Sequence, residues 1–235
     1  MSIAMLEEAC VALGPLVNQV VFLGGATLTL WVTDPGAPPV RPTRDVDVVV
    51  EVTTRSRFHA FEAELRRARF DEDMEGGVLC RWKHRDSGLL LDAMPADPRI
   101  LGFDNRWQRQ SLPHAARRLL PSKTEIRAVS PAFLVATKLE AFLSRGHDDY
   151  VGSRDFEDVI TLVDGRDELV SEVGRAPDDL RTYLSSTLQA MRREARFLDG
   201  VFAALRPDAA SQARAESVVL PRLDELIGYE SSAVT

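Results

Sequence analysis

The sequence has few cysteines and no long apolar run. Its only two cysteines, Cys10 and Cys80, are too few for a disulfide framework and form no recognisable zinc motif. No stretch reaches the roughly 18 apolar residues of a membrane span, and Glu7 and Glu8 stand where a signal peptide would be basic. We therefore expect a cytoplasmic protein in a reducing compartment, without contact to a membrane.

An excess of positive charge is also missing. The net charge is −7, with 29 basic and 36 acidic residues, which argues against a protein that coats nucleic acid with its whole surface. The basic residues nevertheless bunch locally, at 66–69, 81–85, 116–118 and 191–196. Each bunch is explained either as a solvated helix or strand face or as part of a local basic patch.

The chain of 235 residues, 45% of them hydrophobic, is long enough for one large or two modest domains. The patterns in its first half predict a mixed α/β structure. The expected helices are at 2–14 and 56–69 with another that starts near 26, the expected strands are at 20–23 and 45–52, a proline-rich loop is at 35–42, and a hairpin covers 77–95. The second half has helical patterns, and Pro221 is expected to break the last of them. We predict an α+β fold.

Two carboxylates one residue apart, in RPTRDVDVVV at 41–50, are the first sign of chemistry. In a strand, Asp45 and Asp47 point to one face, while Val46, Val48 and Val50 point to the other and into a core. A divalent cation would relieve their repulsion, and Mg²⁺ prefers one or two carboxylates with substrate phosphates. Alternatively, both acids are merely exposed at a strand edge.

Two further features strengthen the metal interpretation. Asp92 ends the apolar run 89–91, so a neighbouring strand would bring it beside Asp45 and Asp47 as a third ligand. Gly24 and Gly25 form a strand–turn–helix junction whose backbone N–H groups suit phosphate oxygens, although a glycine pair alone is often only a tight turn.

Together these motifs resemble the nucleotidyltransferase fold of the DNA polymerase β superfamily. KLEAFLSR at 138–145 and DFED at 155–158 match K-L-x-A-x-x-x-R and D-x-x-D, so the chain is similar to the AbiEii toxins of type IV toxin–antitoxin systems, including the MenT nucleotidyltransferases. The likeness spans about residues 20–165. Many relatives have Gly-Ser where this chain has Gly24-Gly25, so a serine contact to the triphosphate is missing.

The resemblance implies a polymerase β-like core at 1–125 and a helical domain at 126–235 that completes the active-site cleft. It implies an NTP substrate, Mg²⁺ or Mn²⁺ on Asp45, Asp47 and Asp92, and triphosphate contacts from Gly24, Gly25, Lys138 and Arg145, with Arg44 on phosphate or acceptor. Asp155 would orient Lys138 or help deprotonate the nucleophile. The residues alone leave alternatives open. Lys138 and Arg145 could extend their charged ends into water over an apolar helix face, and Asp155 could cap a helix.

The acceptor is the most open question. Related toxins add nucleotides to the 3′ end of tRNA, which blocks aminoacylation and growth, and a neighbouring gene encodes an antitoxin. The basic residues at 81–85 and 116–127 then serve as RNA contacts. An aminoglycoside-type antibiotic is the alternative acceptor, because a strongly acidic protein suits a cationic drug. A degenerate fold kept as a binding module is a third possibility, against which the complete acid set argues.

Overall fold

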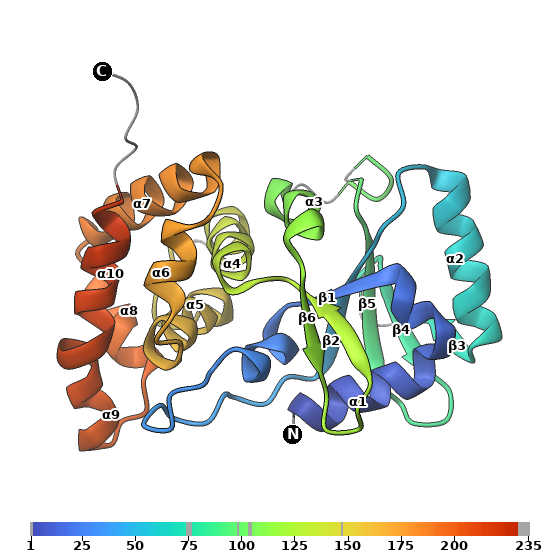
Figure 1. The fold of residues 1–235 in the computed structure, drawn as a ribbon, viewed down its shortest axis with the longest axis horizontal. Coiled ribbons are helices and arrows are strands. Elements are labelled where there is room, and N and C mark those ends of the chain that lie inside the picture. Colours follow the sequence, from blue (N-terminus) through green and yellow to red (C-terminus); the bar gives the residue numbers. More distant parts are fainter. Residues whose placement is uncertain (1, 74–76, 98, 103–104, 147, 230–235) are drawn as a thin grey trace. The chain divides into compact units, whose positions relative to one another are not determined.

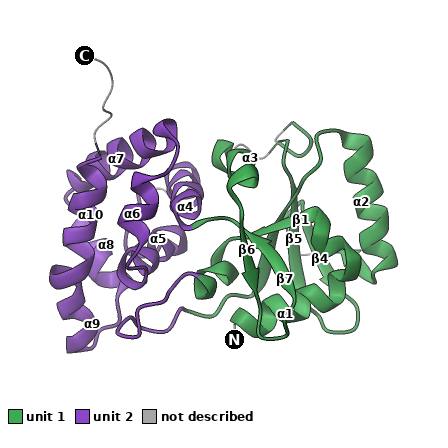
Figure 2. Ribbon diagram, in the orientation of Figure 1, with its two compact units in different colours: residues 1–30, 41–130 green, residues 31–40, 131–235 purple. Residues whose placement is uncertain are grey.

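The structure is a computed structural model that describes residues 2–73, 77–97, 99–102, 105–146 and 148–229. Two compact units make up the chain (Figure 2). The first consists of residues 1–30 and 41–130, and the second of residues 31–40 and 131–235. The first unit holds the β-sheet and the second is helical, so the predicted α+β class, a mixed sheet followed by a helical bundle, is confirmed.

The first unit is built on a seven-stranded mixed sheet with the order β3-β4-β5-β2-β1-β7-β6 (Figure 1). The central strand β2 pairs in parallel with β5 and antiparallel with β1, and β1 pairs in parallel with β7. The strands are β1 (Val20–Leu23), β2 (Asp45–Val50), β3 (Phe70–Glu72), β4 (Arg81–His84), β5 (Leu90–Pro95), β6 (Ala116–Leu119) and β7 (Glu125–Ala128).

Valines explain why β1 and β2 lie at the centre of this sheet. Val46 and Val48 of β2 are fully buried, as are Val20 and Val21 of β1, and β-branched side chains pack well on a pleated surface. Short helices and turns join or flank the strands: α1 (Ser2–Leu13), η1 (Gly14–Gln19), η2 (Gly25–Leu30), α2 (Arg55–Arg67), α3 (Arg106–Ser111) and η3 (Leu112–His114).

The second unit is a bundle in which α4 packs on α5 and α7, and α10 packs on α7. Its elements are α4 (Pro131–Arg145), α5 (Arg154–Gly165), α6 (Leu169–Gly174), α7 (Asp178–Arg192), α8 (Phe197–Ala204), α9 (Ala209–Arg214), the π-helical turn η4 (Ala215–Val219) and α10 (Leu220–Ile227). Pro221 lies in the first turn of α10, directly after that wide turn, as expected of a residue without an N–H.

Residues 31–40 leave the first unit and join the helical one. The backbone N–H groups of Thr33 and Asp34 donate to the carbonyl oxygen of Gly165, at 2.8 and 3.1 Å. Arg214 binds Asp34 at 2.5 Å and Asp164 at 2.7 Å. The segment preceding the proline loop is therefore fastened to α5 and α9, which the sequence pattern did not indicate.

Three local expectations differ from the structure. The helix expected after Gly25 is a six-residue 3-10 helix, in which Thr27 N–H and its hydroxyl both bind the carbonyl of Gly24. The long helical pattern at 177–205 is divided into α7 and α8. Strands β6 and β7 were not predicted, because ARRL and EIRA are too short and too charged to read as strands. None of the helices in the described ranges has the length and apolar character needed to span a bilayer.

Candidate active site

The sheet of the first unit brings Asp45, Asp47 and Asp92 onto one face. Asp47 stands opposite Asp92 in the parallel pairing of β2 with β5, and opposite Leu23 in the antiparallel pairing with β1. Asp45 lies two residues from Asp47 on the same strand and so shares its face. The register of β2 with β5 therefore brings the three carboxylates onto neighbouring strands, and their role as metal ligands stays a prediction.

Gly24 closes one side of this face. Its φ of +74° is in the left-handed region, where glycine has no steric penalty. A Cβ at this position would lie 1.9 Å from Oδ2 of Asp47, so the carboxylate rests directly on the glycine backbone. The conformation and the close approach both require glycine here, which gives Gly24 a role in placing Asp47.

An arginine that the sequence analysis did not assign to the site lies between two of the acids. Arg81 of β4 stands opposite Asp92 in the β4–β5 pairing. Its Nε and Nη2 donate to the two oxygens of Asp92, both at 2.8 Å, and Nη2 also donates to Oδ2 of Asp45 at 2.5 Å. We call Asp45, Asp47, Asp92 and Arg81 the carboxylate cluster.

Electrostatics confirm that the charges of the cluster act on one another. Hydrogen bonding to Asp92, aided by the charges of Asp92, Asp45 and Asp47 against the opposing effect of burial, raises the pKa of Arg81 above its ordinary value. Burial, reinforced by Asp92 and Asp47, raises the pKa of the adjacent Cys80 thiol to about 12. Cys80 is therefore a protonated, unreactive thiol beside a negatively charged site.

The donor set of the cluster suits a hard divalent cation, because it offers carboxylate oxygens on one face. In the described ranges, however, no three His, Cys, Asp or Glu side chains are arranged to enclose a metal ion. The guanidinium of Arg81 lies between Asp45 and Asp92 instead. The metal site with three ligands remains a prediction. The carboxylate oxygens are the donors that such an ion prefers.

The residues just before β2 shape its first acid. The Thr43 hydroxyl lies 3.1 Å from Oδ1 of Asp45 and 3.2 Å from its carbonyl oxygen. Arg44, expected to contact phosphate or acceptor, is exposed at this end of the strand. Its side chain is thus accessible to a ligand, whereas Thr43 constrains Asp45.

A second cluster, the lysine cluster, lies in the helical unit. Nζ of Lys138 on α4 is 3.0 Å from Oδ1 of Asp155 and 2.7 Å from Oδ2 of Asp158, both on α5. The other oxygen of Asp155 pairs with Nη2 of Arg145 at 2.9 Å. The two motifs found in the sequence, on α4 and α5, therefore meet through their charged residues.

The lysine cluster is mostly buried. Asp158 is 0% exposed and the Lys138 side chain 13%, whereas the Arg145 side chain is 71% exposed. Burial alone would raise the pKa of Asp155, but the charges and hydrogen bonds of Lys138 and Arg145 lower it below its ordinary value. An ionised carboxylate already paired with two cations is a poor general base.

The first turn of α5 explains why Asp155 is free to bind cations. The N-cap is Ser153, whose hydroxyl accepts from the backbone N–H of Phe156 at 3.4 Å. The capping role considered for Asp155 thus belongs to Ser153. Rings of Phe142 on α4, Tyr150 and Phe156 on α5 pack together.

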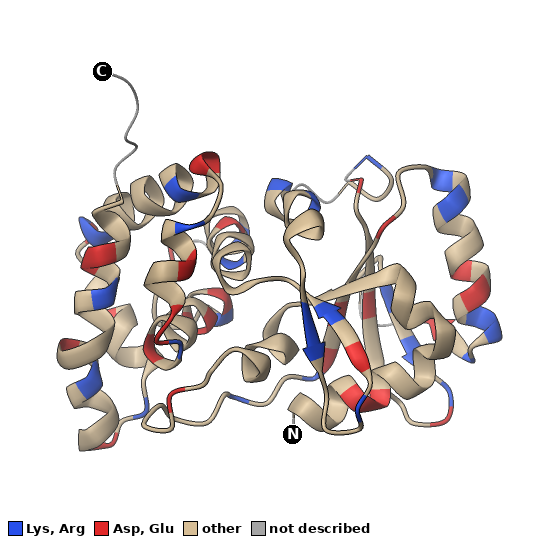
Figure 3. Ribbon diagram, in the orientation of Figure 1, with Lys and Arg blue, Asp and Glu red and all other residues tan. Residues whose placement is uncertain are grey.

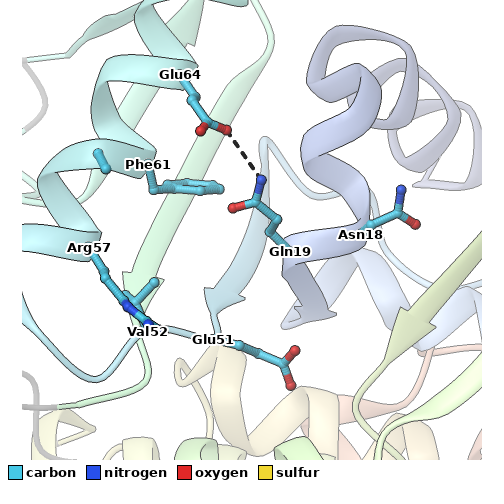
Figure 4. A pocket seen from close by; sticks show the side chains of 8 residues that line it. Asn18, Gln19, Glu51, Val52, Arg57, Phe61 and Glu64 are labelled. Atoms are coloured by element: carbon cyan, nitrogen blue, oxygen red, sulfur yellow. Dashed lines mark hydrogen bonds between the residues drawn. The ribbon is translucent and has the colours of Figure 1, made fainter.

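A pocket of about 410 Å³ in the first unit lies elsewhere. Its walls come from η1, the end of β2 and α2, and Figure 4 shows Gln19 reaching to Glu64, with Phe61 beside them. Glu51 and Val52 follow β2, whereas Asp45 begins it, so the pocket is at the opposite end of that strand. It is therefore separate from the carboxylate cluster.

A family model agrees with the motifs. A family model described as nucleotidyl transferase AbiEii toxin, type IV TA system, matches residues 8–227. The crystal structure of JHP933 from Helicobacter pylori is 12% identical, with a TM-score of 0.45 over 96% of this chain and 88% of that one. A candidate nucleotidyltransferase from H. pylori is 10% identical, with a TM-score of 0.44 over 96% and 91%. No curated protein matches the sequence.

Proposed function

The chain belongs to the AbiEii family of nucleotidyltransferase toxins of type IV toxin–antitoxin systems, and we propose that it transfers a nucleoside monophosphate from an NTP to the 3′ end of tRNA. In this reaction an acceptor hydroxyl attacks the α-phosphorus, a new P–O bond forms, and the bond to the β-phosphate breaks to release pyrophosphate. Modified tRNA would no longer be aminoacylated, and growth would stop.

One observation carries this proposal: three carboxylates, Asp45, Asp47 and Asp92, lie on adjacent strand positions of one sheet face against Gly24. We propose that they hold Mg²⁺ or Mn²⁺. When bound, such an ion neutralises charge on the transferring phosphoryl group. Asp47 has the most constrained position, since it is fixed between Gly24 and Asp92, and we expect it to be the least replaceable ligand.

The lysine cluster supplies the cations that a triphosphate requires. We propose that Lys138 offsets phosphate charge and that Asp155 and Asp158 orient its ammonium group, as their distances of 3.0 and 2.7 Å support. The side chain of Arg145 is largely exposed, so we propose that it contacts a phosphate group or the acceptor. Because Asp155 is held in two ion pairs, we assign it to positioning rather than to proton abstraction.

Support for tRNA as acceptor comes from the family resemblance more than from the basic clusters. Most of the arginines at 81–85 and 116–127 donate to carboxylates: Arg81 to Asp92, Arg85 to Asp71, Arg117 to Glu125 and Arg127 to Glu51. Figure 3 shows the two signs of charge interspersed over both units. RNA contacts are therefore expected from exposed cations such as Arg44 rather than from a continuous basic face.

The experiment is to incubate the protein with each radiolabelled NTP, Mg²⁺ and total tRNA, and to follow label on RNA. Wild type should label a tRNA band, and Asp45→Ala, Asp47→Ala and Lys138→Ala should not. Arg85→Gln, which alters an exposed ion pair on the same hairpin, is the matched control and should label normally. Label on an aminoglycoside but not on RNA would replace the tRNA assignment with the antibiotic one.

Cellular expression gives an independent readout. The wild-type chain should arrest growth when induced, and the neighbouring antitoxin gene should relieve the arrest. Lys138→Ala should be harmless at equal protein level. Growth arrest that persists in both Asp47→Ala and Lys138→Ala would show that toxicity does not depend on the proposed chemistry.

A further inference from the structure

The guanidinium of Arg81 is placed where a cation shared by Asp45 and Asp92 would lie. It binds both oxygens of Asp92 side-on and one oxygen of Asp45, with distances of 2.5 to 2.8 Å. The Arg81 side chain is 17% exposed and that of Asp92 10%. Partial burial strengthens these contacts relative to a surface pair.

The pairing follows from the backbone and is not an accident of a long side chain. Arg81 and Asp92 are directly opposite in the antiparallel β4–β5 ladder, and Asp92 is directly opposite Asp47 in the parallel β5–β2 ladder. Arg85, on the same hairpin, instead pairs with Asp71, where both side chains are about half exposed. One arginine of the basic run 81–85 thus faces the site, and another faces solvent.

A divalent cation at the carboxylate cluster would share its ligands with Arg81. The guanidinium already contacts Asp45 and Asp92, and Asp47 stands opposite Asp92 on the same face of the sheet. The approach of the ion to Asp45 meets a guanidinium that already occupies the oxygen, so both cations compete for the same ligand.

From this geometry we infer that Arg81 is an internal counter-cation that competes with the divalent ion for Asp45. Without metal it holds Asp45 and Asp92 together against their repulsion. On metal binding it releases Asp45, to which it makes one bond, and keeps its fork on Asp92, because each oxygen of that carboxylate has a second lone pair for the ion. Arg81 is thus a positioning residue that sets how tightly the site binds metal. This inference rests on the proposed metal site.

The test measures metal binding directly, by titrating the full-length protein with Mn²⁺ and following free Mn²⁺ by electron paramagnetic resonance. Arg81→Gln should bind Mn²⁺ at least about tenfold more tightly than wild type, because a positive charge close to the ion is removed. Arg81→Lys keeps the charge without the fork and should lie between the two. Arg85→Gln is the control and should bind as wild type does.

Thermal unfolding gives a second readout that also checks folding. Metal-free Arg81→Gln should melt below wild type, because Asp45 and Asp92 lose their shared counter-ion, and saturating Mn²⁺ should raise its melting temperature more than that of wild type. Arg85→Gln should show the wild-type shift. A folded Arg81→Gln protein in which Mn²⁺ produces a larger shift supports the inference even where the absolute affinity is low.

The outcomes separate this inference from the function on which it rests. If wild type binds Mn²⁺, Asp47→Asn abolishes that binding, and Arg81→Gln binds equally or more weakly, then the metal site stands and Arg81 is not a competitor. If neither wild type nor Arg81→Gln binds Mn²⁺, both the metal site and the inference are overturned.

Discussion

Each unit of the molecule places one basic side chain between two aspartates, yet the two arrangements differ in composition and burial. In the helical unit, Lys138 lies between Asp155 and a fully buried Asp158, and Arg145 pairs with Asp155. In the sheet unit, Arg81 lies between Asp45, which is partly exposed, and Asp92, with Asp47 as an additional acid. Two carboxylates hold the lysine of the helical unit in place. For the sheet unit we propose that the carboxylates also accept a divalent cation.

Asp47 has no counterpart in the lysine cluster of the helical unit, so its removal tests the comparison most strongly. Asp47→Asn should lower nucleotidyl transfer by about 10³-fold or more, because it removes a proposed ligand of the catalytic ion. Its melting temperature should stay close to that of wild type, since the amide has the shape of the carboxylate and fits against Gly24 in the same way. Single-turnover transfer of labelled nucleotide, together with thermal unfolding, measures both. Activity within tenfold of wild type would contradict the assignment of Asp47.

Burial predicts stability effects of different size for matched aspartates in the two clusters. Asp158→Ala should lower the free energy of unfolding by about 3–5 kcal/mol, because it breaks a buried ion pair of Lys138. Asp45→Ala should change it by less than about 1 kcal/mol, since Asp45 is partly exposed and its partner Arg81 keeps both of its bonds to Asp92. Urea unfolding of both variants is the measurement. Equal losses of unfolding free energy in the two variants would contradict the proposed difference in burial between the clusters.

The sequence was sufficient for the parts of the site whose chemistry lies in local spacing. Asp45 and Asp47 are two apart on a strand, and Lys138 and Arg145 are seven apart on a helix, so periodicity alone puts each pair on one face. A neighbouring strand that carries Asp92 was also anticipated, because an apolar run ended in an acid; that it pairs in parallel with β2 was not. The helix that carries Asp155 begins and ends at the expected residues, Arg154–Gly165.

The role of Arg81 was not accessible in that way. In the sequence it belongs to the basic run RWKHR, and nothing local separates it from Arg85. Only the register of β4 on β5 sets Arg81 opposite Asp92 while Arg85 falls beyond the strand. Register depends on long-range pairing, which a single sequence does not reveal. The attachment of residues 31–40 to α5 and α9 was missed for the same reason.

Glycine provides a third contrast, between a turn at the carboxylate cluster and one away from it. Gly24 and Gly88 have nearly equal φ angles, +74° and +75°, so alanine should introduce about 1–2 kcal/mol of backbone strain at either position. Only at Gly24 would the new Cβ meet Oδ2 of Asp47; at Gly88 nothing lies within 4 Å. Gly24→Ala should therefore lose about 10²-fold in transfer activity, and Gly88→Ala should not. Comparable activity in the two variants would show that Asp47 tolerates displacement.

The smallest expected effect is on the stability of the fold in acid. It tests whether the ion pairs of Asp155 in the lysine cluster make the unfolding free energy depend on pH. The pKa of Asp155 is lowered in the folded chain, net of burial, by the charges of Lys138 and Arg145. A carboxyl group whose pKa is lower in the folded state stabilises the fold at pH values above its pKa in the unfolded state. This contribution disappears as the pH falls through its pKa in the folded state. Unfolding free energy should consequently decline less between about pH 5 and pH 2 in Asp155→Asn than in wild type. Urea titrations at several pH values measure this slope, with Asp71→Asn, an exposed acid paired with Arg85, as the reference for a surface carboxyl. Identical slopes in wild type and Asp155→Asn would show that the ion pairs of Asp155 do not contribute to stability.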